Sequence, residues 1–106
     1  MSVPARSDAQ RRQALAAALE ARTERVRVRS AIRAGDLTAA EVIRGAGERS
    51  QWAALPVAWL ISCVPGFGPV RTARLLAAAA VPKNRRVQGL GVRQRALLVD
   101  ALEAAS

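Results

Sequence analysis

The spacing of apolar and polar positions along the chain predicts an all-helical protein. Residues 8–33 contain no glycine or proline and are rich in alanine, leucine, arginine and glutamate, which favours one long helix. Ser7 and Gln10 are spaced as a capping box at its start, and Gly35 is suited to its end. Apolar and basic positions are not cleanly separated around this helix. We therefore expect it to pack only in part, with its N-terminal half projecting into solvent.

Shorter helices are predicted from the residues that follow. Thr38 and Glu41 form a second capping box, which opens a helix that ends near Gly45. Residues 52–64 form the longest mainly apolar run and predict a third helix, with Pro56 in its first turn, where a missing N–H is best tolerated. We expect both tryptophans of this run to lie in the core or at its edge.

A fourth helix is predicted to begin at Pro69, the favoured first position, and to reach Ala80. Residues 82–91 contain proline, asparagine and two glycines and predict two successive turns. A last helix follows over residues 92–104. Its packing face is expected to contain Leu97, Leu98, Ala101 and Leu102.

The size and composition of the chain agree with one small domain over residues 1–106. Hydrophobic residues make up 51% of the chain, but 24 of them are alanine and only three are aromatic. This composition disfavours a β-sandwich or a barrel. The expected fold class is therefore all-α, with about five helices.

The chain lacks histidine and has a single cysteine, Cys63. These absences remove the commonest metal ligands, the usual general base and any intramolecular disulfide. We therefore expect no cofactor, no small-molecule substrate and no enzymatic activity. Cys63 stands in an apolar run and is expected to fill a small space in the core. No apolar leader or membrane span is recognised, so we expect a cytoplasmic protein.

Basic residues are concentrated in two blocks. The chain carries 17 basic and 8 acidic residues, a formal charge of +9, and 16 of the basic residues are arginine. Residues 1–33 hold eight arginines against three acidic residues, whereas residues 65–95 hold seven basic residues and no acidic one. Blocks of one sign repel themselves and usually persist because a polyanion compensates them. This distribution indicates a nucleic acid as the partner.

The stretch between the third and fourth predicted helices has the features of a phosphate site. Gly66 and Gly68 allow a tight turn and the close approach of a ligand to the backbone. The free N–H groups of the helix that begins at Pro69 face an anion with the positive end of the helix dipole. Arg71 and Arg74 lie one helical turn apart and can flank the same phosphate.

Further residues are expected to join this site. Those near the two predicted turns are Lys83, Arg85, Arg86, Gly89, Gly91, Arg93 and Arg95. The last two arginines fall in the first turn of a helix, where the dipole disfavours cations, which indicates a role beyond stability. A secondary surface is expected from Arg22, Arg25, Arg29 and Arg33. We expect the glycine bends at residues 66–68 and 89–91 to gather with these arginines into one cationic patch.

Several motifs in order resemble the mycobacterial-type, actinobacterial integration host factors. The runs PGFGPVRTAR and NRRVQGLG follow one another along the chain, and RQR comes after the second. An earlier family pattern is matched by Ala18, Ala21, Arg22 and Arg25. The resemblance implies an all-helical nucleoid-associated protein with a helix–two-turns–helix module, here over residues 51–104. It also implies binding of duplex DNA with little sequence preference, mainly through the phosphate backbone, and an influence on DNA shape.

By this resemblance, phosphate is contacted by the bend at residues 66–68 with Arg71 and Arg74, and by Arg85 and Arg86 with the bend at residues 89–91. The chain departs from the family pattern where basic residues are common, at Ala54, Pro56, Pro69 and Gln88. We therefore expect weaker DNA binding than that of a typical member, or a greater contribution from the arginines of the long helix.

Other interpretations share some of these features. The two-turn module also occurs in a small-subunit ribosomal protein, which would make RNA the partner, but this chain ends in an acidic segment rather than a basic tail. It occurs too in DNA glycosylases of the formamidopyrimidine type, whose catalytic N-terminus is not matched by Ser2, Val3 and Pro4. A third alternative is a helical adaptor that binds a protein through residues 52–64. We expect a monomer whose partner is double-stranded DNA and which is associated with the nucleoid.

Overall fold

The computed structural model describes residues 7–105, and Ser2, Val3 and Pro4 lie outside the described residues. Within this range the chain forms six α-helices and one short 3-10 helix, η1, and no strand, which confirms the all-α class. The elements are α1 (Asp8–Ala34), α2 (Ala39–Gly45), α3 (Ser50–Ala53), α4 (Val57–Ser62), α5 (Pro69–Ala78), η1 (Val87–Gly89) and α6 (Val92–Ala104). Among the described helices, none combines the length and the apolar character that a membrane crossing requires.

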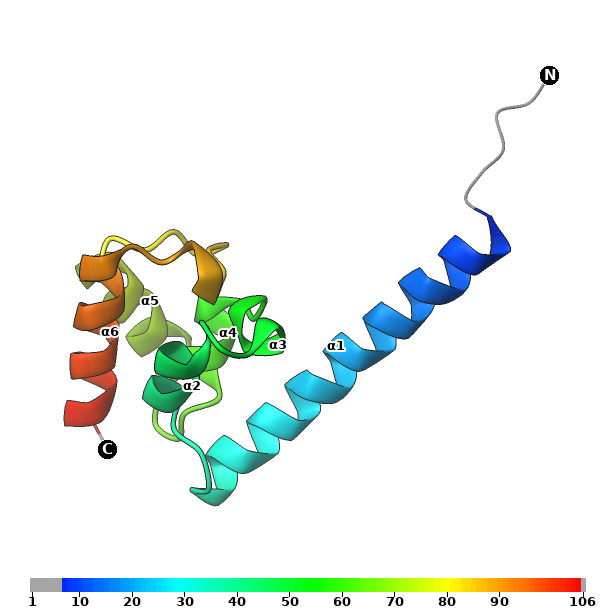
Figure 1. Ribbon diagram of the computed structural model, residues 1–106. Coiled ribbons are helices and arrows are strands. Elements are labelled where there is room, and N and C mark those ends of the chain that lie inside the picture. The colour runs from blue at the N-terminus through cyan, green and yellow to red at the C-terminus, as the bar shows by residue number, and fades with distance from the viewer. Residues whose placement is uncertain (1–6, 106) are drawn as a thin grey trace.

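Helix α1 stands away from the rest of the molecule over most of its length (Figure 1). The predicted capping box is present, because the Ser7 hydroxyl accepts from the Gln10 N–H and the Gln10 side chain accepts from the Ser7 N–H. Gly35 ends the helix in the left-handed conformation, with φ 82°. Within α1, Val28 and Ile32 are the buried residues. The predicted projection is thereby confirmed, and the molecule measures 58 × 29 × 26 Å.

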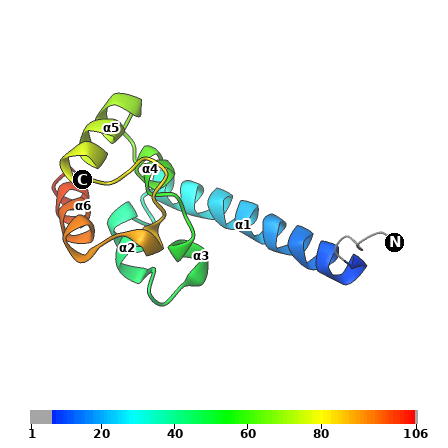
Figure 2. The same ribbon diagram turned by 90° about the horizontal axis from the view of Figure 1, so that it is seen from above.

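The core is formed where α2 packs against α6 and α4 packs against α5 (Figure 2). The largest fully buried side chains are Ile43, Leu60, Ile61, Leu98, Val28, Val42, Val57 and Val87. Cys63 is buried among them, as predicted. Trp52 and Trp59 are half-buried and pack against this core, so their predicted place at its edge is confirmed.

The single helix expected over residues 52–64 is wrong, because α3 and α4 are separated by an extended segment around Pro56. Proline has no N–H to donate, and its ring disfavours the helical conformation in the preceding residue. Two backbone hydrogen bonds of 2.9 Å join this extended segment to the residues on either side of Arg86. The break therefore coincides with a tertiary contact that the local pattern does not contain.

Two smaller differences concern α5 and α6. Helix α5 ends two residues before Ala80, which has a positive φ of 55°, and the Val81 N–H donates across the end to the Leu76 carbonyl. Helix α6 begins at the predicted residue and buries Leu98 and Leu102 of the predicted packing face. Leu97 of that face is instead 52% exposed, and Val99 is buried.

Candidate nucleic-acid interface

The bend at residues 66–68 connects α4 to α5. Gly66 has φ 89°, a conformation that L-residues rarely adopt, so the bend requires glycine at this position. Phe67 is 7% exposed and packs into the core. Gly68 has φ −80° and is the N-cap of α5, and a Cβ built on it would meet no atom within 4 Å. Glycine at position 68 therefore leaves open space in front of the helix rather than serving a special backbone conformation.

The start of α5 carries backbone donors that no side chain caps. The first helical hydrogen bond runs from the Thr72 N–H to the Gly68 carbonyl, at 3.0 Å. The N–H groups of Val70 and Arg71 therefore lie ahead of the helical ladder, and Pro69 has no N–H. Together with the positive end of the helix dipole, these groups have the geometry that the sequence predicts for an anion site, and anion binding there stays a prediction.

Two arginines of α5 lie beside this bend. The Arg71 Cζ lies 4.0 Å from the centroid of the Phe67 ring, and its Nη1 donates to the Gly66 carbonyl at 3.3 Å. Arg74 is exposed one helical turn further along. The guanidinium of Arg71 is therefore held over the bend by two contacts, and both arginines are open to solvent.

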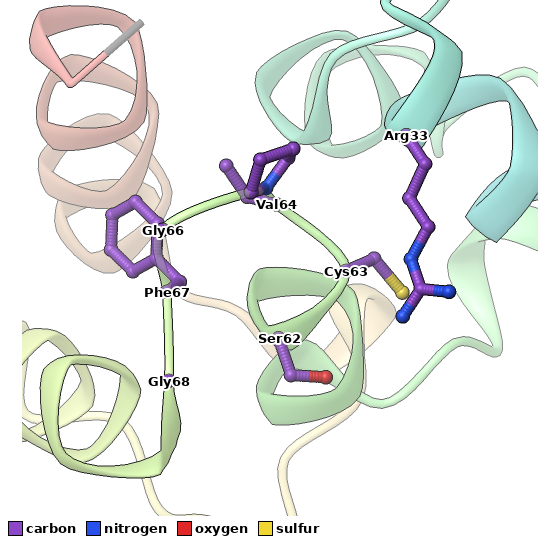
Figure 3. Close-up of a pocket in the computed structure, with 8 residues that line it drawn as sticks. Arg33, Ser62, Cys63, Val64, Gly66, Phe67 and Gly68 are labelled. Atoms are coloured by element: carbon purple, nitrogen blue, oxygen red, sulfur yellow. The ribbon is translucent and has the colours of Figure 1, made fainter.

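An open hollow of about 540 Å³ lies beside the same bend (Figure 3). It is lined by residues 62–68 and by Arg33, whose guanidinium reaches from α1 toward the Cys63 thiol. Burial raises the pKa of Cys63, and the positive charges of Arg29 and Arg33 oppose this effect. The net shift is upward, so the thiol is neutral near pH 7 and contributes no negative charge to the hollow.

The arginines of the expected secondary surface lie exposed along α1, at Arg22, Arg25, Arg29 and Arg33. The Cζ atoms of Arg25 and Arg29 lie 5.9 and 5.6 Å from the ring centroid of Trp59 on α4. The Trp52 Nε1–H donates to Glu24 at 3.2 Å and binds the same stretch of α1 to α3. Indole contacts therefore join the C-terminal half of α1 to α3 and α4, and Arg33 is the arginine of this group that lines the hollow.

The predicted turns at residues 82–91 form the connection between α5 and α6 and are confirmed. Lys83 and Arg86 are exposed on this connection. The guanidinium of Arg86 also donates to the carbonyl of Ala54, the C-cap of α3, which directly precedes the extended segment around Pro56. These two cations are therefore presented by a backbone that is fixed on both sides.

Arg85 is directed inward. Its Nη1 donates to the Gly89 carbonyl at 2.7 Å and to the Gln94 Oε1 at 3.4 Å. A Cβ built on Gly89 would lie 2.7 Å from the Arg85 Cδ, so glycine at this position makes room for the arginine. The Gly91 N–H is also used internally, because it donates to the Gln94 Oε1 at 2.9 Å. Arg85, Gly89 and Gly91 therefore stabilise the connection between α5 and α6 through contacts within it.

Arg93 and Arg95 point in different directions. Arg93 is exposed in the first turn of α6, whereas Arg95 is half-buried and its Nη1 donates to the Ile43 carbonyl of α2 at 2.8 Å. Side chains two residues apart on a helix project about 200° apart, so one face cannot present both. The expected convergence of Arg95 with the two turns is therefore wrong.

The bend at residues 66–68 precedes α5, whereas residues 89–91 follow the connection after α5 and lead into α6. Helix α5 has ten residues and is therefore about 15 Å long, and η1, which contains Gly89, packs against α3. The expectation of one cationic patch over both bends stays a prediction. The first basic surface consists of Arg25, Arg29, Arg33, Gly66, Gly68, Arg71 and Arg74. The second basic surface consists of Lys83, Arg86 and Arg93.

Sequence reasoning missed two residues that organise these surfaces. Gln94 stands three residues after the N-cap of α6, where a glutamine signals a capping box, but glycine at the cap concealed the pattern. Glu24 is the second, because its carboxylate accepts a hydrogen bond from the indole N–H of Trp52. A glutamate near a helix face that meets tryptophans is a weak signal, so this contact required the fold.

Comparison with known proteins agrees with this architecture. Residues 32–102 match the family model described as an S13-like H2TH domain. The integration host factor of Streptomyces coelicolor is 33% identical over 98 residues, which cover 92% of each chain. That of Mycobacterium tuberculosis is 28% identical over 105 residues, 99% of this chain and 100% of the relative.

A solved structure is similar as well. It is described as sIHF bound to an 8 bp palindromic DNA, and it superimposes with a TM-score of 0.74 at 30% identity. The match covers 80% of this chain and 96% of that chain. The motifs that resemble the actinobacterial family are thus supported over nearly the whole sequence. The chain belongs to the integration host factor family, which is built on an S13-like H2TH domain.

Proposed function

We propose that this protein binds double-stranded DNA with little sequence preference and organises the nucleoid as a monomer in the cytoplasm. The observation that carries the proposal is the first basic surface, where the uncapped start of α5 lies beside exposed arginines from two helices. Residues 65–95 contain no acidic side chain that would compete with phosphate for these donors. The similar sIHF structure, which contains DNA, supports the same partner.

The donors of the first basic surface suit phosphate rather than bases. Backbone N–H groups, a helix dipole and guanidinium groups recognise charge and geometry that every phosphate shares. The Phe67 ring is buried, so it is not available to wedge between base pairs. The proposal is therefore that contacts position the protein on the sugar–phosphate backbone and that sequence contributes little.

The basic residues and glycines of this region have two proposed roles. The exposed residues of both basic surfaces are proposed to contact phosphate, whereas Arg85, Gly89 and Arg95 are proposed to stabilise the fold. Two departures from the family pattern reduce the donors at these surfaces, since Pro69 removes one N–H and Gln88 carries no charge. We propose that the arginines of α1 offset part of this loss.

A salt titration of binding to a random DNA duplex tests the proposal. Four to six phosphate contacts give a slope of log K against log salt of roughly −4 to −5. A flat response would refute the proposal. A matched RNA duplex serves as the competitor, because tighter binding to RNA would favour the ribosomal-type alternative.

A pair of variants separates phosphate contact from net charge. Arg71→Gln is expected to make the slope shallower by about 0.9, the contribution of one phosphate contact. Arg44→Gln removes the same charge, but Arg44 pairs with Glu103 and lies outside both basic surfaces. This control is expected to leave the slope nearly unchanged. Equal effects of the two variants would contradict the assignment of the first basic surface.

A further inference from the structure

The side-chain amide of Gln94 joins three segments of the connection between α5 and α6. Its Oε1 accepts from the Gly91 N–H at 2.9 Å and lies 3.4 Å from the Arg85 Nη1. Its Nε2 donates to the Ala80 carbonyl at 2.7 Å. One amide group therefore ties the end of α5, the side chain of Arg85 and the start of α6.

The Ala80 end of this network is a strained position. Ala80 is the one non-glycine residue with positive φ among those that the structure describes, at 55°. The left-handed conformation is unfavourable for a residue with a Cβ, so surrounding contacts must maintain it. The hydrogen bond from Gln94 falls on the carbonyl of this same residue.

The Arg85 end of the network reaches the second turn. The guanidinium donates to the Gly89 carbonyl at 2.7 Å while its stem passes over the glycine. Arg85 and Gln94 thereby hold positions 80, 89 and 91 relative to one another. The cations of the second basic surface, Lys83, Arg86 and Arg93, all lie within or directly after this braced segment.

We infer that Gln94 is a positioning residue for the second basic surface, acting with Arg85 and without contacting DNA. The inference rests on the proposed function, because the surface that Gln94 orders is the one proposed to bind phosphate. A surface that is ordered before binding loses less conformational entropy on binding, so this ordering increases the affinity for DNA. The number of released counterions, in contrast, depends on phosphate contacts alone.

The test is Gln94→Met, which keeps the length of the side chain and removes the amide. Binding to a random duplex should weaken on the order of fivefold to tenfold, while the salt slope stays at the wild-type value. Exchange of the Gly91 amide hydrogen, measured by NMR without DNA, should accelerate because its acceptor is gone. Gln88→Met is the matched control, since it makes the same change at an exposed residue of the same connection.

Arg85→Lys examines the second half of the network. Lysine keeps the charge but lacks the planar fork that reaches a carbonyl and an amide together. A positioning role predicts a loss comparable to that of Gln94→Met and little added loss in the double variant. Near-wild-type affinity with lysine would contradict the positioning role of Arg85.

The outcomes separate the two claims. If the wild-type protein shows no salt-dependent binding, the proposed function fails, whereas the amide exchange still reports whether Gln94 braces the connection. If wild-type binding is salt-dependent and Gln94→Met matches Gln88→Met in affinity and exchange, the inference about Gln94 is overturned. A shallower slope in Gln94→Met would likewise overturn it, because a phosphate contact would then have been lost. Circular dichroism at the assay temperature confirms that each variant is folded.

Discussion

Replacing Gly68 by aspartate should make the protein more stable and a poorer DNA binder. Gly68 is the N-cap of α5, has extended backbone angles that any residue adopts, and has open space where a Cβ would lie. An aspartate there can accept from the N–H groups of Val70 and Arg71, which no side chain now caps. The better cap and the favourable interaction with the helix dipole together stabilise by about 0.5–1 kcal/mol. For a chain of this size, thermal unfolding should shift upward by roughly 2–6 °C.

The same carboxylate should weaken DNA binding, because it occupies the donors that are proposed for phosphate and repels the phosphate itself. The loss of one phosphate contact makes the salt slope shallower by about 0.9. The affinity at 0.1 M salt is expected to fall on the order of tenfold. Thermal unfolding by circular dichroism and fluorescence anisotropy with a labelled random duplex measure the two effects on one preparation.

Gly68→Ser serves as a matched control, because its hydroxyl caps the same N–H groups without a charge. It should stabilise by a few tenths of a kcal/mol and weaken binding less than the aspartate does. The reasoning would be refuted if Gly68→Asp bound DNA as tightly as the wild type. It would be refuted equally if the variant lost affinity only because it had become unstable.

Further predictions concern single positions. Gly66→Ala should destabilise by about 1–2 kcal/mol in thermal unfolding, because φ is 89° there. Trp52→Phe removes the hydrogen bond to Glu24 and should lower the free energy of unfolding, measured in urea, by about 1 kcal/mol. Amide hydrogen exchange should accelerate mainly in the C-terminal half of α1. Arg95→Gln should lower the unfolding free energy by about 1–2 kcal/mol and leave the salt slope unchanged, since its guanidinium serves the Ile43 carbonyl. Burial raises the pKa of Cys63, so the folded state keeps this proton above the pH at which the unfolded chain releases it. Its stabilising contribution is therefore complete below about pH 8.5 and is lost as pH rises further, and iodoacetamide should label the thiol slowly at pH 8 unless urea is added.

Elements that are fixed by neighbours in sequence were predictable. Both capping boxes, at Ser7 and at Thr38, form because the two partners are three residues apart and need no other part of the fold. Pro69 opens α5 for the same reason, since its fixed φ suits the first position of a helix. The uncapped N–H groups at the start of α5 were therefore predictable from the sequence, because these donors follow from where the helix begins.

Features that depend on distant segments were not predictable in the same way. The break at Pro56 is stabilised by backbone pairing with the segment around Arg86, thirty positions along the chain. The inward direction of Arg95 depends on where α2 lies, and neither position carries a local signal of it. Counting charges treats every arginine alike. It therefore assigned arginines that form hydrogen bonds within the fold, such as Arg95, to the same site as arginines that are exposed to solvent.

Hydrogen bonds from arginines to backbone carbonyls explain how one residue type both stabilises this fold and presents positive charge at its surface. Arg71, Arg85, Arg86 and Arg95 each donate to a carbonyl outside their own helix or turn. A guanidinium has five N–H donors, so one such bond leaves others for phosphate when the side chain is exposed. Arg71 and Arg86 meet this condition, whereas Arg85 and Arg95 are half-buried and do not. Anchoring also restricts the long side chain before DNA arrives, which lowers the entropy lost on binding. An exposed, carbonyl-anchored arginine should therefore contribute more to affinity than the free Arg74, although each adds the same amount to the salt slope.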